Sequence, residues 1–123
     1  MKYLLPILLL VGGLALNTSA ADRKLYHVVS FKFKETATKE QIKEVEDAFR
    51  DLKKKIKEIQ SYEWGTNVSP EKHDKGFTHA FILSFKSDAD RDAYLAHPDH
   101  KAFGKQLGPI LADVFVIDFW SAK

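Results

Sequence analysis

The sequence of 123 residues contains no cysteine. This absence excludes disulfide bonds, thiolate metal sites, iron–sulfur clusters and cysteine nucleophiles. The excess of one sign of charge over the other is also small, because 19 basic residues against 17 acidic residues leave a formal net charge of +2. Such a balance gives no strong attraction for nucleic acid, so we expect no nucleic-acid partner. The sequence also lacks a glycine-rich phosphate loop and a nucleophile-elbow serine, and nothing in it predicts a cofactor.

What the sequence does contain is apolar material for one modest core. Hydrophobic residues make up 45% of the chain, including nine Phe, four Tyr and two Trp. A chain of this length is typical of a single domain, and this composition is sufficient to offset the entropy cost of folding. Without cysteine, that domain depends on packing or on association with a second copy.

The first 21 residues have the pattern of a secretory signal peptide. One lysine precedes an apolar run over residues 4–16, and small or polar residues follow over 17–21. A helix of that run would span roughly 20 Å, less than the ~30 Å hydrocarbon core of a bilayer, so a permanent anchor is the weaker alternative. We expect cleavage after Ala20 or Ala21, an exported (periplasmic or secreted) domain over 22–123, and no membrane association afterwards.

The periodicity of the remaining chain predicts an α+β fold. Alternating apolar residues indicate strands, and a stripe at helical spacing after a Thr38 capping box indicates a long helix. Asp88 is expected to cap a short helix, and Pro98 to begin the next. The expected elements are strand 25–34, helix 38–58, strands 61–68 and 77–86, helices 88–95 and 98–107, and strand 114–120. This order, β-α-β-β-α-β, is that of a ferredoxin-like antiparallel sheet with helices on one face.

The sheet face without helices is expected to be too apolar to face water. It would carry either Val28, Ala80, Ile82, Phe115, Ile117 and Phe119, or the complementary set of alternating residues. A second copy of the same sheet is the simplest cover, so we expect a homodimer through this face, forming a dimeric α+β barrel.

A histidine-rich segment, His97-Pro98-Asp99-His100, begins the second short helix. The position of His100 in the first turn predicts a neutral imidazole, which a general base requires, because the helix dipole disfavours the imidazolium. A kink at His97-Pro98 could bring the hydroxyl of Tyr94 towards His100. The structural alternative is that His97 caps the helix and His100 is a half-buried packing residue.

Two more histidines lie on the apolar faces of strands, His27 beside Val29 and His79 beside Phe81. With His100 they could line one pocket between sheet and helices. A three-imidazole metal site is an alternative, but chance placement explains such a set more simply, and we predict no metal. Asp118, the single acid in an apolar strand, could orient an imidazole or could mark an edge position facing water.

Five segments resemble the stress-responsive A/B barrel domain (Dabb) family. They are residues 27–34 (HVVSFKFK), 64–70 (WGTNVSP), 75–79 (KGFTH), 94–103 (YLAHPDHKAF) and 116–119 (VIDF). The resemblance covers residues 25–120 and implies a ferredoxin-like homodimer with a cavity between sheet and helices, without implying one activity. The sequence is also distantly similar to a plant polyketide cyclase of this family. That likeness implies a catalytic pair at Tyr94 and His100, with the histidine as base, and pocket residues at His27, His79 and Asp118.

The functional expectation is therefore an exported Dabb-type dimer that binds a small, partly apolar molecule. Its cavity would be lined by Tyr94, His100, His27, His79, His97, Asp118, Val29, Phe81 and Phe103. One alternative is a cyclase or lyase in which Tyr94 and His100 carry out acid–base chemistry. Another is a stress-protective dimer without catalysis, so the residues leave open whether the protein is an enzyme.

Overall fold

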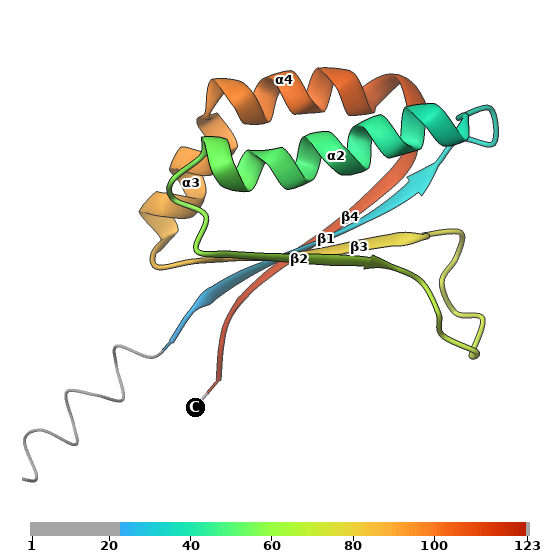
Figure 1. The fold of residues 1–123 in the computed structure, drawn as a ribbon. Helices are drawn as coiled ribbons and strands as arrows, with labels where there is room; N and C mark the ends of the chain where they lie inside the picture. The colour runs from blue at the N-terminus through green and yellow to red at the C-terminus, as the bar shows by residue number, and fades with distance from the viewer. Residues whose placement is uncertain (1–22, 123) are drawn as a thin grey trace, which may run out of the picture.

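The computed structural model describes residues 23–122, so the predicted signal peptide lies outside the described residues. A four-stranded sheet forms one layer and the helices form a second layer on one of its faces (Figure 1). The elements follow in the predicted order: β1 (Leu25–Phe33), α2 (Lys39–Lys55), β2 (Ser61–Thr66), β3 (His79–Phe85), α3 (Asp88–Ala96), α4 (Pro98–Leu107), a 3₁₀ turn η1 (Gly108–Ile110) and β4 (Leu111–Trp120). The ferredoxin-like α+β fold is confirmed.

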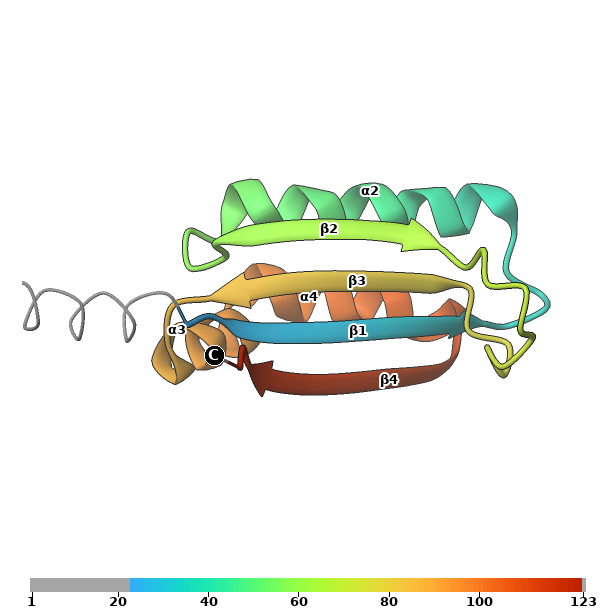
Figure 2. The same cartoon turned by 90° about the horizontal axis from the view of Figure 1, so that it is seen from below.

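The strands are antiparallel and lie in the order β2-β3-β1-β4 (Figure 2). β1 and β3 are adjacent and central. The β1–β4 register places His27 opposite Asp118, and the β1–β3 register places His79 opposite Phe31. His27 and His79 therefore lie four positions apart along the sheet, a separation of roughly 13 Å.

The long helix begins at the predicted capping box. Thr38 Oγ1 accepts a hydrogen bond from the Gln41 amide (3.1 Å), and the Gln41 side chain accepts one from the Thr38 amide (2.9 Å). The predicted end at residue 58 was wrong, because α2 ends at Lys55 and Ile56 has an extended backbone. Ile56 and Ile59 are nevertheless buried. Their apolar spacing continued the helical stripe, although a turn brings them to the core.

The two short helices meet at the predicted break. His97 caps α4, since its Nδ1 accepts a hydrogen bond from the Asp99 amide at 3.1 Å, and Pro98 occupies the first turn. The expectation that Asp88 caps α3 was wrong, because the Ser87 hydroxyl accepts from the Asp90 amide at 3.1 Å. A serine hydroxyl serves this role as well as a carboxylate does.

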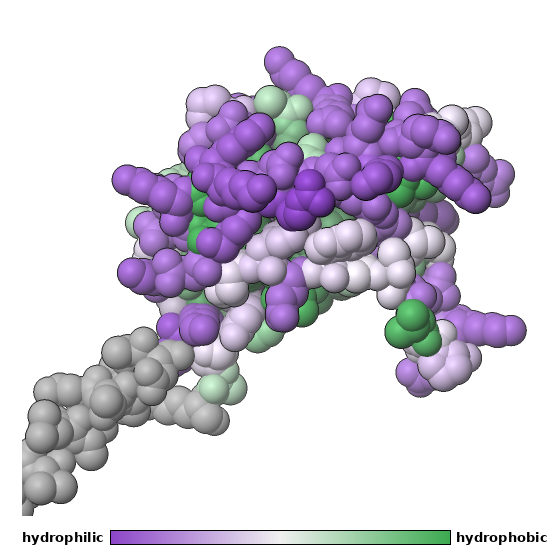
Figure 3. Space-filling view, viewed as in Figure 1, coloured by the Kyte–Doolittle hydropathy of each residue, from purple (hydrophilic) through white to green (hydrophobic). Residues whose placement is uncertain are grey.

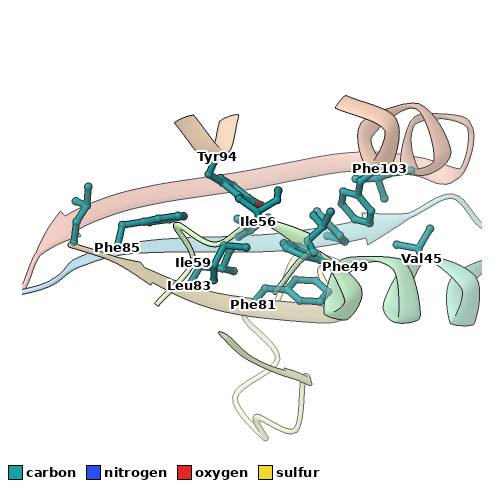
Figure 4. Close-up of a cluster of buried hydrophobic side chains, with 14 of the residues drawn as sticks. Val45, Phe49, Ile56, Ile59, Phe81, Leu83, Phe85, Tyr94 and Phe103 are labelled. Carbon is teal, nitrogen blue, oxygen red and sulfur yellow. The ribbon is translucent and has the colours of Figure 1, made fainter. Parts of the chain in front are cut away.

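Aromatic packing holds the helices on the sheet (Figure 4). The Phe49 ring of α2 lies 4.4 Å from the Phe81 ring of β3 and 4.8 Å from the Phe103 ring of α4, centroid to centroid. Val29 belongs to the same buried cluster. Three residues that the sequence placed in a cavity wall, Val29, Phe81 and Phe103, thus lie in the packed core.

Within residues 23–122, no helix lies on the opposite face of the sheet (Figure 1). Of the two expected alternating sets, this face carries the one with Val28, Ile82 and Ile117, since the residues facing the helices are the buried ones on β1 and β3. Below the purple helix layer in Figure 3 the surface is pale, with green apolar patches along its lower edge. We call this surface the open face; its large exposed apolar residues are Ile82, Phe115, Ile117 and Phe119.

None of the helices within residues 23–122 combines the length and the apolar character needed to cross a bilayer.

Candidate functional site

Tyr94 and His100 lie in contact where α3 gives way to α4. Tyr94 is on the last turns of α3 and is only 1% exposed, whereas His100 is half-buried in the first turn of α4. Their ring centroids are 4.6 Å apart with 58° between the planes. The break at His97-Pro98 therefore does bring the phenol ring to His100, as the spacing predicted.

A second imidazole lies against the same phenol. The His27 ring of β1 is 5.8 Å from the Tyr94 ring in an edge-on arrangement at 69°, and it is 5% exposed. Its Nδ1 lies 2.6 Å from Oδ1 of Asp118 on β4. Of the two roles considered for Asp118, the structure shows the one in which it contacts an imidazole. We call Tyr94, His100, His27 and Asp118 the tyrosine–histidine cluster.

Burial shifts the pKa values of two members of this cluster, His100 and Tyr94. The pKa of His100 is lowered chiefly by burial and further by the nearby His27, while a hydrogen bond to the backbone of Leu95 opposes the shift. Burial likewise raises the pKa of the Tyr94 phenol well above its usual value. At neutral pH the cluster therefore holds a neutral imidazole beside a protonated phenol. The neutral state of His100, predicted from the helix dipole, is therefore favoured chiefly by burial.

His79 lies apart from this cluster. Its Nε2 is 2.7 Å from Oε2 of Glu46 on α2, and its Nδ1 is 2.8 Å from the Thr78 hydroxyl. The Trp64 ring stacks on it at 5.8 Å and 9°. The structure thus separates His79 from His27, and the three-imidazole set does not form. Across residues 23–122 we find no group of three histidine, aspartate or glutamate side chains placed to hold a metal.

A hollow of about 610 Å³ lies on the open face rather than beneath the helices. The loop between β2 and β3 descends from the sheet (Figure 1), and its residues line one side of the hollow. Open-face residues such as Ser30, Ile82 and Phe115 form the floor, and His73 and Phe77 of the loop contribute to the wall. This hollow lies on the surface that the sequence assigned to a second copy.

Sequence reasoning missed three polar residues near these groups. Arg91 of α3 contacts Asp118, and Glu46 of α2 contacts His79. The Tyr62 hydroxyl is buried, and among residues 23–122 it has no hydrogen-bond partner. Alternation with Trp64 along the strand could have placed Tyr62 under the helices. Arg91 and Glu46 are 27 and 33 residues away in sequence from the side chains that they contact, and no local pattern indicates these contacts.

The chain matches a family model described as "Stress responsive A/B Barrel Domain" over residues 25–121. It is 33% identical over 93 residues to the stress-response A/B barrel domain-containing protein HS1 of Arabidopsis thaliana, covering 76% of this chain and 85% of that protein. It is also 26% identical over 97 residues to olivetolic acid cyclase of Cannabis sativa, covering 79% of this chain and 96% of the cyclase.

Among solved structures, the hydroxynitrile lyase from Passiflora edulis aligns with a TM-score of 0.76 at 25% identity, over 81% of this chain and 94% of the lyase. Two similar bacterial proteins, from Thermobifida fusca and Bacteroides fragilis, are described as dimeric with a ferredoxin-like fold.

Proposed function

The chain belongs to the stress-responsive A/B barrel domain family, and we propose that it binds a small, partly apolar molecule at the tyrosine–histidine cluster. One observation carries this proposal: a buried, protonated phenol lies between two imidazoles, one of them neutral. Core packing alone rarely places three titratable rings together, because burying polar groups is costly unless they are satisfied.

The chemistry of the cluster indicates an oxygen-bearing ligand. Tyr94 can donate a hydrogen bond to a carbonyl or hydroxyl oxygen, and a neutral imidazole can accept one from a hydroxyl. The Tyr62 hydroxyl is a second buried donor. A negative charge on the Tyr62 phenol would raise the pKa of Tyr94 further, so the two phenols are within electrostatic reach of each other. The apolar part of the ligand would lie against rings such as Phe85, which is 5.2 Å from Tyr94. Half-buried His100 marks the side from which a ligand would enter.

Acetophenone is a suitable probe because it presents one carbonyl oxygen on an apolar body. We expect calorimetry to detect binding to the wild-type protein, with about 10-fold weaker affinity in Tyr94→Phe, since one hydrogen bond to the ligand is lost. α-Methylstyrene, which replaces the oxygen by a CH₂ group, should bind both proteins equally.

The control is His73→Gln, which changes the wall of the open-face hollow and leaves the cluster intact. Its affinity for acetophenone should equal that of the wild type. No binding to the wild type, or a loss in His73→Gln without a loss in Tyr94→Phe, would remove the proposal.

We also propose that the protein acts as a homodimer closed through the open face. The support is the apolar character of that face and the dimeric description of the similar bacterial proteins. In such a dimer the 610 Å³ hollow faces the second copy.

Export is proposed on the pattern of residues 1–21 alone. The mass of the protein recovered from the periplasm or medium of an expressing bacterium should correspond to a chain beginning at Ala21 or Asp22. A full-length mass in the membrane fraction would instead indicate a retained anchor.

Acid–base catalysis is the second candidate function, and the contact between a neutral imidazole and a protonated phenol favours it. Two similar proteins are named as a cyclase and a hydroxynitrile lyase. With a cyanohydrin, His100 would take the hydroxyl proton, the carbon–cyanide bond would break, and an aldehyde and cyanide would leave. Tyr94 would hold the oxygen on which the carbonyl forms.

A further inference from the structure

We propose that Arg91 is a positioning residue that acts through Asp118 to fix the tautomer and the orientation of His27 beside Tyr94. The inference deepens the proposed function and rests on it, because it assigns a role to a residue outside the cluster. The proposed effect of Arg91 on the cluster passes through the Asp118 carboxylate and needs no contact between Arg91 and the Tyr94 phenol.

The geometry divides the Asp118 carboxylate between two partners. Oδ1 lies 2.6 Å from His27 Nδ1, and Oδ2 lies 3.0 Å from Arg91 Nη1. An ionised carboxylate only accepts hydrogen bonds, so His27 must carry a proton on Nδ1. Nε2 is then the nitrogen left to exchange a proton or a hydrogen bond with a ligand, which is how a second partner selects an imidazole tautomer.

Arg91 is itself held in place by its own helix. Its Nε donates to Asp92 Oδ1 at 3.1 Å, and its Nη2 lies 3.6 Å from Asp88 Oδ1. The guanidinium is a rigid planar group with fixed donor directions, so these contacts determine where Nη1 points. The side chains of Arg91 and Asp118 are each 22% exposed, so their attraction is less screened than that of a surface pair.

The placement of Arg91 in the fold ties this network to the site. Arg91 and Tyr94 are one helical turn apart on α3, whereas Asp118 and His27 belong to neighbouring strands. A shift of α3 would therefore move the Tyr94 phenol together with the Arg91 guanidinium that contacts the Asp118 carboxylate. The charged or titratable groups that surround His27 are Asp118, Tyr94 and His100, with Arg91, Asp88 and Asp92 behind Asp118.

A purely structural role is the competing explanation, in which the ion pair only fastens α3 to the sheet. Nitrogen NMR of the histidine side chains at pH 8 separates the two, because the two imidazole tautomers give different nitrogen shifts. In the wild type we expect His27 to be in the Nδ1–H form. In Arg91→Met we expect a mixture containing the Nε2–H form, because the freed carboxylate can rotate away from the ring. The His79 signals should not change.

The matched control is Arg50→Met, which removes the same charge from an exposed pair with Asp47 on α2. It should leave the His27 tautomer unchanged. Arg91→Lys retains the charge, and His27 should keep most of the Nδ1–H form in it. If circular dichroism shows that Arg91→Met does not fold, the tautomer is measured in Arg91→Lys instead. The affinity for acetophenone should fall about threefold to tenfold in Arg91→Met and recover in Arg91→Lys.

The outcomes distinguish this inference from the proposed function. The tautomer is measured without ligand, so a wild type that binds no acetophenone removes the proposed function and leaves the tautomer result valid. An unchanged His27 tautomer in Arg91→Met overturns the positioning role, even if acetophenone binds at the cluster. A tautomer change of equal size in Arg50→Met would also overturn it, because the effect would then be a general loss of charge.

Discussion

Replacing Ile117 by lysine is expected to convert a dimeric protein into a monomer. Ile117 lies on the open face in the edge strand β4, paired with Val28 of β1 and 48% exposed in the single chain. In a face-to-face dimer the new ammonium group would be buried without a partner, which costs several kcal/mol. The dissociation constant of the dimer should rise by about 1,000-fold, and sedimentation velocity at micromolar concentration should show the smaller species.

Leu95→Lys is the matched control for this experiment. Leu95 is a large apolar residue of α3 with 41% exposure, and it lies on the helix side of the sheet. Its substitution adds the same charge to a similarly exposed position and should leave the dimer intact. A wild type that sediments as a folded monomer, or an Ile117→Lys variant that remains dimeric, would contradict closure through the open face.

His100→Gln is expected to lower cyanohydrin cleavage by about 100-fold if the cluster is catalytic. Glutamine keeps a polar side chain at the start of α4 but cannot take a proton, and a positioned general base typically contributes 100-fold or more to the rate. The release of benzaldehyde from mandelonitrile can be followed by absorbance. Because the pKa of His100 is lowered, the base remains neutral below the pH at which an exposed histidine protonates, so wild-type activity should persist to slightly acidic pH.

The comparison enzyme is His73→Gln, which changes a histidine in the loop of the open-face hollow. It should cleave mandelonitrile at the wild-type rate. A wild-type rate no higher than that in buffer, or equal rates in wild type and His100→Gln, would exclude catalysis of this reaction by His100. The proposal that the cluster binds a small molecule would then depend on the acetophenone binding measurements alone.

The sequence was sufficient where the structural signal is local. The capping box at Thr38 and the proline at the start of α4 predicted helix starts that the structure confirms, because caps depend on side chains one turn away. Strand alternation likewise sorted the residues of β1 and β3 into two faces, and the structure shows which of the two faces the helices. Element ends were predicted less well, because Ile56 is apolar at helical spacing but reaches the core through a turn.

The candidate site was predictable in part. The Tyr94–His100 contact follows from a kink within six residues, and spacing could indicate it. The expected grouping of His79 with His27 did not form, since both lie on the helix side of central strands but four positions apart along them. That distance depends on strand register, which the alternation of apolar residues does not determine. The contacts of Arg91 and Glu46 are also set by tertiary packing.

The five histidines of the chain allow one direct test of where a small molecule binds. His27 and His100 belong to the tyrosine–histidine cluster, His79 pairs with Glu46, His97 caps α4, and His73 borders the open-face hollow. Imidazole NMR signals of all five should be followed while acetophenone is added to the wild-type protein. The proposed function predicts saturable shifts at His27 and His100 with little change at His73 and His79. Shifts confined to His73 and His79, or no saturable shift at any histidine, would contradict it.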